Sequence, residues 1–164
     1  MTQRAREQGA TATDRTATLQ LVIALARAFQ AVALGVRPHL GESGLSMTEF
    51  AVLEMLYHKG PLRLGELRDR IMVTGASTTY VVKKLEERGL MRRRVHDEDQ
   101  RVVFGELTAK GRHLIDEVFP THVDRLQDLM AGLTVADKQA AARLLRRLSR
   151  HARHATGERL TDDD

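Results

Sequence analysis

One stretch of this chain, residues 90–108, interrupts a pattern that is otherwise helical. It reads LMRRRVHDEDQRVVFGELT, with apolar residues ahead of a charged centre and again after it. Apolar and β-branched residues on both sides of a polar turn are typical of two antiparallel strands. We therefore expect a β-hairpin here. The apolar residues that flank its turn are Leu90, Met91 and Val95 before it and Val102, Val103, Phe104 and Leu107 after it.

Helices with clear start and stop signals are expected on both sides of this hairpin. Apolar residues recur at helical spacing from residue 16 to Pro38, where the proline predicts the end of the first helix. Ser46 with Glu49, and Thr134 with Asp137, have the spacing of capping boxes. Thr108 is also expected to cap a helix, which Pro120 should bend, and Gly89 to end one. The short segment LGELRDRIM is expected to be helical although no capping residue precedes it.

The order of elements predicts a mainly α (α+β) fold, a winged helix-turn-helix with long N- and C-terminal dimerisation helices. The terminal helices carry apolar stripes that the middle of the chain does not obviously cover, and a two-fold dimer would bury them. The expected divisions are a disordered arm (1–15), a dimerisation helix (16–40), the winged helix-turn-helix (45–108), C-terminal dimerisation helices (109–156) and an acidic tail (157–164).

Composition limits the classes of function. The 26 Lys and Arg against 22 Asp and Glu give a net charge of +4, so binding of an anion must come from local clustering. The absence of cysteine excludes disulfides, thiolate metal sites and thiol-based redox sensing. No apolar run is expected to approach the roughly 20 residues that span a bilayer, and the N-terminus does not resemble a secretory signal. We expect a cytoplasmic protein without a membrane partner.

The helix expected over residues 75–88 has a polar outer side. Ser and Thr hydroxyls near its start and lysines further along suit a helix that enters the major groove of DNA. An ordinary solvated helix face would have a similar composition. The outer residues are Ser77, Thr79, Tyr80, Lys83 and Lys84.

The hairpin adds a second basic element. Arg92 and Arg94 share one face of their strand, and Asp99 lies two residues before Arg101. A carboxylate can orient a guanidinium, and an oriented arginine can insert into a narrow minor groove. Taken alone, these residues could equally be an exposed ion-pair cluster. A candidate recognition helix followed at once by an arginine-bearing hairpin favours a winged helix-turn-helix.

Four segments resemble the MarR (multiple antibiotic resistance regulator) family over about residues 45–148. They are MTEFAVLEMLYHKGPLRLGELRDRI, STTYVVKKLEERGL, DEDQRVVFGELTAKG and the closing helix, with the spacings L-E-x-x-G-L, D-x-R and L-T-x-x-G. The resemblance implies a homodimeric regulator that binds double-stranded DNA at a palindromic operator and usually represses. It also implies that a small phenolic or other aromatic effector, bound between the dimer helices and the DNA-binding lobe, releases the DNA.

The resemblance also assigns individual residues. Asp99 and Arg101 match the family's wing pair, in which the arginine contacts the minor groove and the aspartate steadies it. Gln100 stands where the family usually has arginine, which removes one possible phosphate contact. Ser77, Thr79, Tyr80 and Lys84 occupy base- and phosphate-facing positions.

The recognition-helix segment looks closest to the branch that answers quinones, phenols or peroxides. Without cysteine the oxidation mechanism of the peroxide sensors is excluded, which leaves reversible ligand binding. The resemblance does not identify the residues of the ligand site, and no cofactor is expected.

Features of the sequence that could indicate other functions are weaker. His151 and His154 have a spacing that could hold a metal ion, but solvated surface histidines are favoured, so no metal site is predicted. The basic stripe at 143–150 is expected to be a solvated face rather than a second DNA contact. No common catalytic motif occurs, so an enzyme is not expected. A winged helix that binds only proteins is the alternative function.

Overall fold

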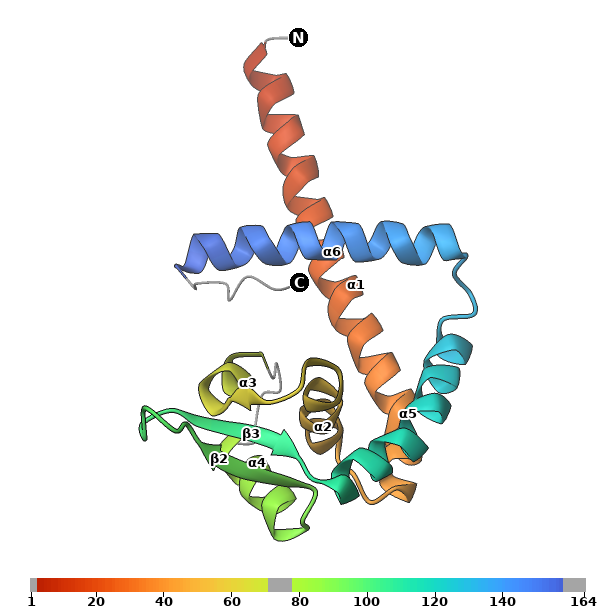
Figure 1. The fold of residues 1–164 in the computed structure, drawn as a ribbon. Helices are drawn as coiled ribbons and strands as arrows, with labels where there is room; N and C mark the ends of the chain where they lie inside the picture. Colours follow the sequence, from red (N-terminus) through yellow and green to blue (C-terminus); the bar gives the residue numbers. More distant parts are fainter. Residues whose placement is uncertain (1–2, 71–77, 158–164) are drawn as a thin grey trace.

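The computed structural model describes residues 3–70 and 78–157, which form helices around one small sheet (Figure 1). The helices are α1 (Gln3–Glu42), α2 (Met47–Lys59), α3 (Leu64–Arg70), α4 (Thr78–Glu87), α5 (Ala109–Leu129) and α6 (Val135–Thr156). The strands are β1 (Leu62–Arg63), β2 (Met91–Val95) and β3 (Val103–Leu107). The expected mainly α fold with a winged helix-turn-helix is confirmed. The expected acidic tail lies outside the described residues, apart from its first residue.

The hairpin is present where the sequence predicted it. β2 and β3 pair antiparallel with Met91 opposite Leu107 and Val95 opposite Val103. The sheet has a third strand that the sequence did not predict, because β1 pairs with the other edge of β3. Two residues between a helix stop and a helix start are too few to show strand alternation, so only the tertiary pairing defines β1.

The core of the lobe lies where α2, α3, α4 and α5 meet the sheet. Its members are apolar side chains with little or no exposed surface, chiefly Leu53, Leu56, Leu67, Val82, Leu85, Met91 and Ile115. Burial of such a side chain stabilises the fold by about 1.5–3 kcal/mol. Packing of these side chains therefore contributes to the orientation of α4 and of the hairpin.

The capping predictions are confirmed. Ser46 and Glu49 form a capping box on α2, Thr134 and Asp137 form one on α6, and the Thr108 hydroxyl accepts from the amide of Gly111 at the start of α5. The sequence showed no capping residue for the short α3, but the helix has one of the two hydrogen bonds of a capping box. Its Glu66 side chain accepts a hydrogen bond from the Arg63 amide at 3.1 Å.

Helix α1 differs from the expectation at both ends. It begins at Gln3, so residues 3–15 are helical instead of forming a disordered arm, and it continues through Pro38 to Glu42. The physical end is a glycine cap. Gly44 has φ +67°, its amide bonds to the Gly41 carbonyl, and the Leu45 amide bonds to the Leu40 carbonyl. Leu40 and Leu45 are both buried, which favours this cap over termination at the proline.

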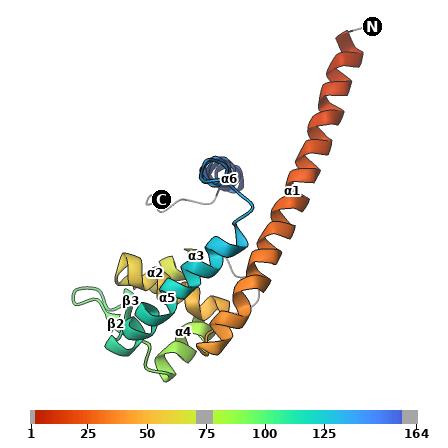
Figure 2. The same cartoon turned by 90° about the vertical axis from the view of Figure 1, so that its right-hand side faces the viewer.

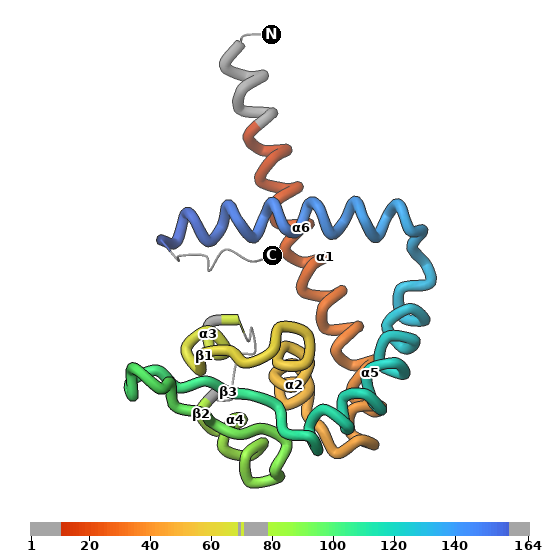
Figure 3. The backbone as a smooth tube through the Cα atoms, viewed as in Figure 1, coloured from red at the N-terminus to blue at the C-terminus, as the bar shows by residue number. Residues whose placement is uncertain are grey.

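The long helices extend away from the lobe. The C-terminal half of α1 packs against α2 and α5, whereas its N-terminal half projects beyond them (Figures 1 and 2). α5 carries Pro120 inside it and changes direction partway along its length, as that proline predicts (Figure 1). A short connection then leads into α6 (Figure 3). Within α6, which is described throughout, no residue is buried.

One expectation about apolar runs is wrong. The segment Thr11–Glu42 is long enough and apolar enough to cross a membrane by length and composition, with a mean hydropathy of 1.8 in its most apolar window. Many of its large apolar side chains are exposed in the single chain, including Leu19 (65%) and Phe29 (66%). A helix of this kind needs another apolar surface, and a partner helix satisfies that need as well as lipid does.

Candidate nucleic-acid interface and adjoining pocket

Burial of one side of α4 determines which of its residues face outward. Val81, Val82 and Leu85 pack into the core, so the residues between them face outward. Thr79 and Lys83 are exposed, and the Tyr80 side chain is 63% exposed. These three positions agree with the sequence prediction. Ser77 lies outside the described residues.

Lys84, which the sequence assigns to the outer side of α4, also pairs with a buried carboxylate. Its Nζ lies 3.2 Å from Oε1 of Glu49 on α2, and Nη1 of Arg88 lies 2.9 Å from the same oxygen. Burial acts to raise the pKa of Glu49, but the hydrogen bonds from Ser46 and the charge of Lys84 outweigh it, so that pKa is lowered. Glu49 therefore stays ionised and ties the recognition helix to α2.

The arginines of β2 are held by carboxylates of neighbouring elements. Arg92 and Arg94 do share one face, and both approach Glu106 of β3, with Nε–Oε distances of 2.6 and 3.4 Å. The Arg94 guanidinium also lies over the Phe104 ring, 5.3 Å from its centroid. Arg93, on the other face, pairs with Glu86 of α4 at 3.0 Å. These contacts balance much of the positive charge of β2.

The tip of the hairpin presents a guanidinium in a fixed position. Asp99 Oδ1 accepts hydrogen bonds from the Arg101 amide at 3.0 Å and from Arg101 Nε at 3.3 Å. The Asp99 carbonyl also accepts from the Val102 amide, which closes the turn. The Arg101 side chain is nonetheless 93% exposed. The orienting contact that the sequence predicted is thus present, and the guanidinium remains accessible to an anion.

The helix and the hairpin tip lie at the end of the molecule away from α6 and from the start of α1 (Figures 1 and 2). Hydroxyls and a lysine on α4, with an exposed arginine at the tip, make a surface that can hydrogen-bond bases and neutralise phosphates. The sequence did not reveal Glu49, Glu86 and Glu106 as partners of the cations. Their spacing from those cations is too long for a local pattern to show.

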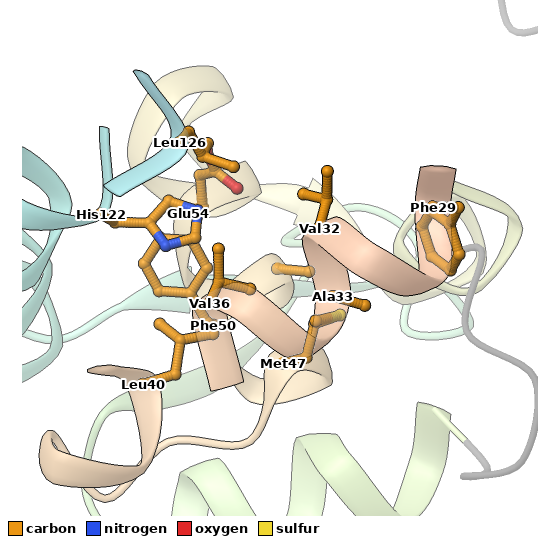
Figure 4. Close-up of a pocket in the computed structure, with 11 residues that line it drawn as sticks. Phe29, Val32, Ala33, Val36, Leu40, Met47, Phe50, Glu54, His122 and Leu126 are labelled. Atoms are coloured by element: carbon orange, nitrogen blue, oxygen red, sulfur yellow. The ribbon is translucent and has the colours of Figure 1, made fainter. Parts of the chain in front are cut away.

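An apolar pocket lies on the other side of α2, between α1 and α5 (Figure 4). Its volume is about 180 Å³. The residues that line it are Phe29, Val32, Ala33, Val36 and Leu40 from α1, Met47, Phe50, Ala51 and Glu54 from α2, and His122 and Leu126 from α5. Burial raises the pKa of Glu54, and the nearby His58 lowers it by less. The sequence alone did not assign any of these residues to a ligand site.

Two histidines meet at this pocket. The ring of His122, 7% exposed, stacks on the Phe50 ring with centroids 4.3 Å apart and lies 6.2 Å from the His39 ring. Burial, followed by the nearby His39, lowers the pKa of His122, so the imidazole is held neutral. His122 Nδ1 and His39 Nε2 are buried and have no hydrogen-bond partner among the described residues. His151 and His154 lie far along the sequence on exposed α6, and the described residues contain no group of three potential metal ligands.

Comparison with known proteins gives consistent matches. The model of the MarR family matches residues 45–103. The HTH-type transcriptional regulator MhqR of Bacillus subtilis is 36% identical over 136 residues, which are 83% of this chain and 94% of that relative.

Two solved structures share the fold. BpsR of Bordetella bronchiseptica, whose DNA binding is regulated by 6-hydroxynicotinic acid, is 29% identical with a TM-score of 0.69 over 76% of this chain and 89% of its own. NadR, solved in complex with 4-hydroxyphenylacetate, is 27% identical with a TM-score of 0.68 over 77% of this chain and 89% of its own. With a winged helix-turn-helix, an exposed wing arginine and a relative matched along nearly its whole length, this chain belongs to the MarR family of transcriptional regulators.

Proposed function

We propose that this protein is a cytoplasmic homodimeric repressor that binds a palindromic operator and is released by a small aromatic compound. The observations that support the DNA-binding part are the exposed polar side of α4 and the accessible Arg101 guanidinium that Asp99 holds at the tip of the hairpin. In this proposal α4 enters the major groove and the hairpin tip enters the flanking minor groove. Two-fold symmetry then sets the half-sites about one helical turn apart.

The residues of α4 and of the hairpin have different roles in the proposed DNA complex. Thr79, Tyr80 and Lys83 are exposed on α4 and are assigned to bases and phosphates, together with Ser77 at its predicted start. Arg101 is assigned to the minor groove, with Asp99 as its support. Arg92, Arg94 and Lys84 have carboxylate partners within the chain, so we assign them chiefly to shaping the surface and only secondarily to phosphates.

We assign effector binding to the pocket between α1, α2 and α5. It is apolar, lies at the junction of the long helices with the DNA-binding lobe, and shares α2 with the contact that holds α4. A ligand that binds better when the lobes have a spacing unsuited to the operator would lower DNA affinity. BpsR and NadR are relatives whose ligands are small aromatic acids, which supports an aromatic effector here.

The DNA-binding proposal is tested by selecting bound duplexes from a random pool and measuring affinity at several salt concentrations. Neutralised phosphates should give a steep fall in affinity with salt, with a slope of about −0.9 per phosphate. Arg101→Ala should weaken binding to every selected duplex and reduce the slope by about one per subunit. Arg150→Ala on α6 removes the same charge elsewhere and should have little effect.

Three other outcomes would each contradict a part of this proposal. If Arg101→Ala keeps wild-type affinity, the wing does not enter the groove as proposed. If the wild-type protein binds no duplex at low salt, the alternative of a winged helix that recognises only proteins is favoured. A fall in affinity in Arg150→Ala as large as in Arg101→Ala would instead assign a DNA contact to α6.

A further inference from the structure

We propose that Glu106 of β3 restrains the binding of this protein to DNA of any sequence, because it holds Arg92 and Arg94 against the sheet and away from phosphates. Weaker binding to unrelated DNA leaves more protein for the operator, so Glu106 determines specificity without touching DNA. The inference rests on the DNA-binding mode proposed above, in which α4 and the tip of the hairpin enter neighbouring grooves. It extends that mode to a residue outside the proposed DNA surface.

The path of β2 brings its arginines near the phosphate backbone in that mode. Three residues separate α4 from β2, which then leads to the hairpin tip (Figure 1). With α4 in the major groove and Arg101 in the flanking minor groove, β2 crosses the phosphate backbone that separates the two grooves. Arg92 and Arg94 lie about 7 Å apart along one face of this strand. Free guanidiniums there would attract phosphates, which carry no information about sequence.

The two guanidiniums share the Glu106 carboxylate. Arg92 lies directly opposite Glu106 in the sheet, and its Nε is 2.6 Å from Oε1. Nε of Arg94 is 3.4 Å from Oε2, so each oxygen has its own arginine. The Glu106 side chain is only 14% exposed, and salt screens a partly buried pair less than an open one. A phosphate must therefore compete with this carboxylate for either arginine.

Arg94 and Arg101 differ in how accessible they are. The Arg94 guanidinium also lies over the Phe104 ring, and its side chain is half-exposed. The Arg101 side chain is almost fully exposed although Asp99 supports it. The hairpin thus presents Arg101 at its tip and holds Arg92 and Arg94 along its strand. This arrangement favours contacts made by α4 and the tip over contacts made by the strand.

Glu106→Gln removes the charge at nearly constant shape and tests the restraint directly. The probe is a mixed-sequence duplex, and fluorescence anisotropy measures its affinity for the full-length protein at several salt concentrations. One additional neutralised phosphate changes the salt slope by about −0.9, which corresponds to roughly eightfold in affinity at 0.1 M salt. Glu106→Gln should bind the duplex more tightly by at least this factor, and its slope should be steeper.

Two further proteins separate released arginines from a general change of charge. Glu117→Gln makes the same change of net charge on the exposed side of α5 and should leave affinity and slope unchanged. Glu106→Gln combined with Arg92→Ala and Arg94→Ala lacks the released guanidiniums and should lose the gain. A triple variant that binds as tightly as Glu106→Gln would show that the lost negative charge alone causes the gain, which would overturn the inference.

Arg94→Ala tests the same inference without changing Glu106, which still pairs with Arg92. Because the carboxylate already holds Arg94, its removal should reduce the salt slope by less than Arg101→Ala does. This comparison remains available if Glu106→Gln fails to fold. An equal reduction in the two variants would mean that Arg94 already contacts a phosphate in the wild-type complex, against the inference.

A Glu106→Gln variant with unchanged or weaker binding and the wild-type slope would limit Glu106 to supporting the hairpin and would overturn its role in specificity. If the wild-type protein binds the duplex and Glu106→Gln shows no gain, only this inference fails. If the wild-type protein binds no duplex at low salt, the DNA-binding proposal itself fails.

Discussion

At the start of α5, the absence of a side chain on Gly111 allows the helix to touch the backbone of Leu90. A Cβ at this position would overlap the Leu90 carbonyl oxygen. Around this contact, Thr108 donates its hydroxyl hydrogen to the Gly89 carbonyl at 2.7 Å and accepts from the Gly111 amide at 3.0 Å. The L-T-x-x-G spacing thus joins the end of the hairpin to the start of α5.

Gly111→Ala should lower the free energy of unfolding by about 1–3 kcal/mol, because the helix must shift away from the Leu90 carbonyl. Gly132→Ala is the matched control. Gly132 has no neighbouring atom within 4 Å of an added Cβ, so its substitution should change stability little. Urea denaturation followed by circular dichroism measures both, and a Gly111→Ala variant as stable as the control would show that α5 can move at low cost.

The lowered pKa of His122 predicts a dependence of stability on pH. Burial and the nearby His39 disfavour the protonated form in the folded state, so the unfolded chain binds the proton more readily. The stability associated with the neutral ring is complete above the ordinary pKa of 6.5 and is lost as the pH falls through the lower folded value. His39 from α1 and Glu54 from α2 are the other titratable groups at this position.

Unfolding free energies of the wild type and of His122→Phe, measured from pH 7.5 to 5, should therefore diverge in slope, with the wild type losing more stability on acidification. Histidines that lie away from His122 keep their surroundings in the variant, so their contributions cancel in the comparison. Parallel curves would mean that His122 does not titrate differently in the folded and unfolded chains.

At the scale of elements, α2 connects the two candidate sites. It contributes Phe50 and Glu54 to the pocket, and its Glu49 pairs with Lys84 of α4 and with Arg88, which directly follows α4. The same carboxylate also accepts from the Ser46 amide at 2.8 Å and caps α2. One buried side chain thus fixes the start of α2 and the position of the recognition helix.

Glu49→Gln should reduce both stability and DNA affinity although Glu49 is not assigned to DNA. The amide can keep the cap but loses the charge that pairs with Lys84 and Arg88, a loss of about 2 kcal/mol. α4 would then be less well fixed, so we expect roughly tenfold weaker operator binding. Glu117→Gln, whose carboxylate is exposed on α5, is the control. Operator affinity unchanged in Glu49→Gln would limit the role of Glu49 to stability.

At the scale of the whole molecule, the single chain leaves large apolar side chains of its long helices exposed. Leu144, Leu145 and Leu148 of α6 are all more than 40% exposed, as are several large apolar residues of α1. Leu148→Glu should therefore produce monomers in sedimentation experiments and weaken operator binding by about 100-fold or more, because the two half-sites are no longer bound together. Gln139→Glu makes the same change of charge at an exposed position of α6 and should remain dimeric. A dimeric Leu148→Glu would place the interface elsewhere.

Features that depend on local interactions could be predicted from the amino-acid sequence. The caps at Ser46, Thr108 and Thr134, the glycine end at Gly89 and the hairpin follow from hydrogen-bonding groups and turn preferences a few residues apart. The support of Arg101 by Asp99 was predictable for the same reason, since two residues separate them.

Contacts between residues that are distant in the sequence became visible only in the folded chain. α1 continues past Pro38 because Leu40 and Leu45 are buried. β1 forms because it pairs with β3, which lies some forty residues away in the sequence. The turn of Lys84 toward Glu49, and the meeting of Glu54 with His122 in one pocket, arise from packing between helices that are far apart in the chain. Long-range packing selects these contacts by the total burial of the core, which no local pattern contains.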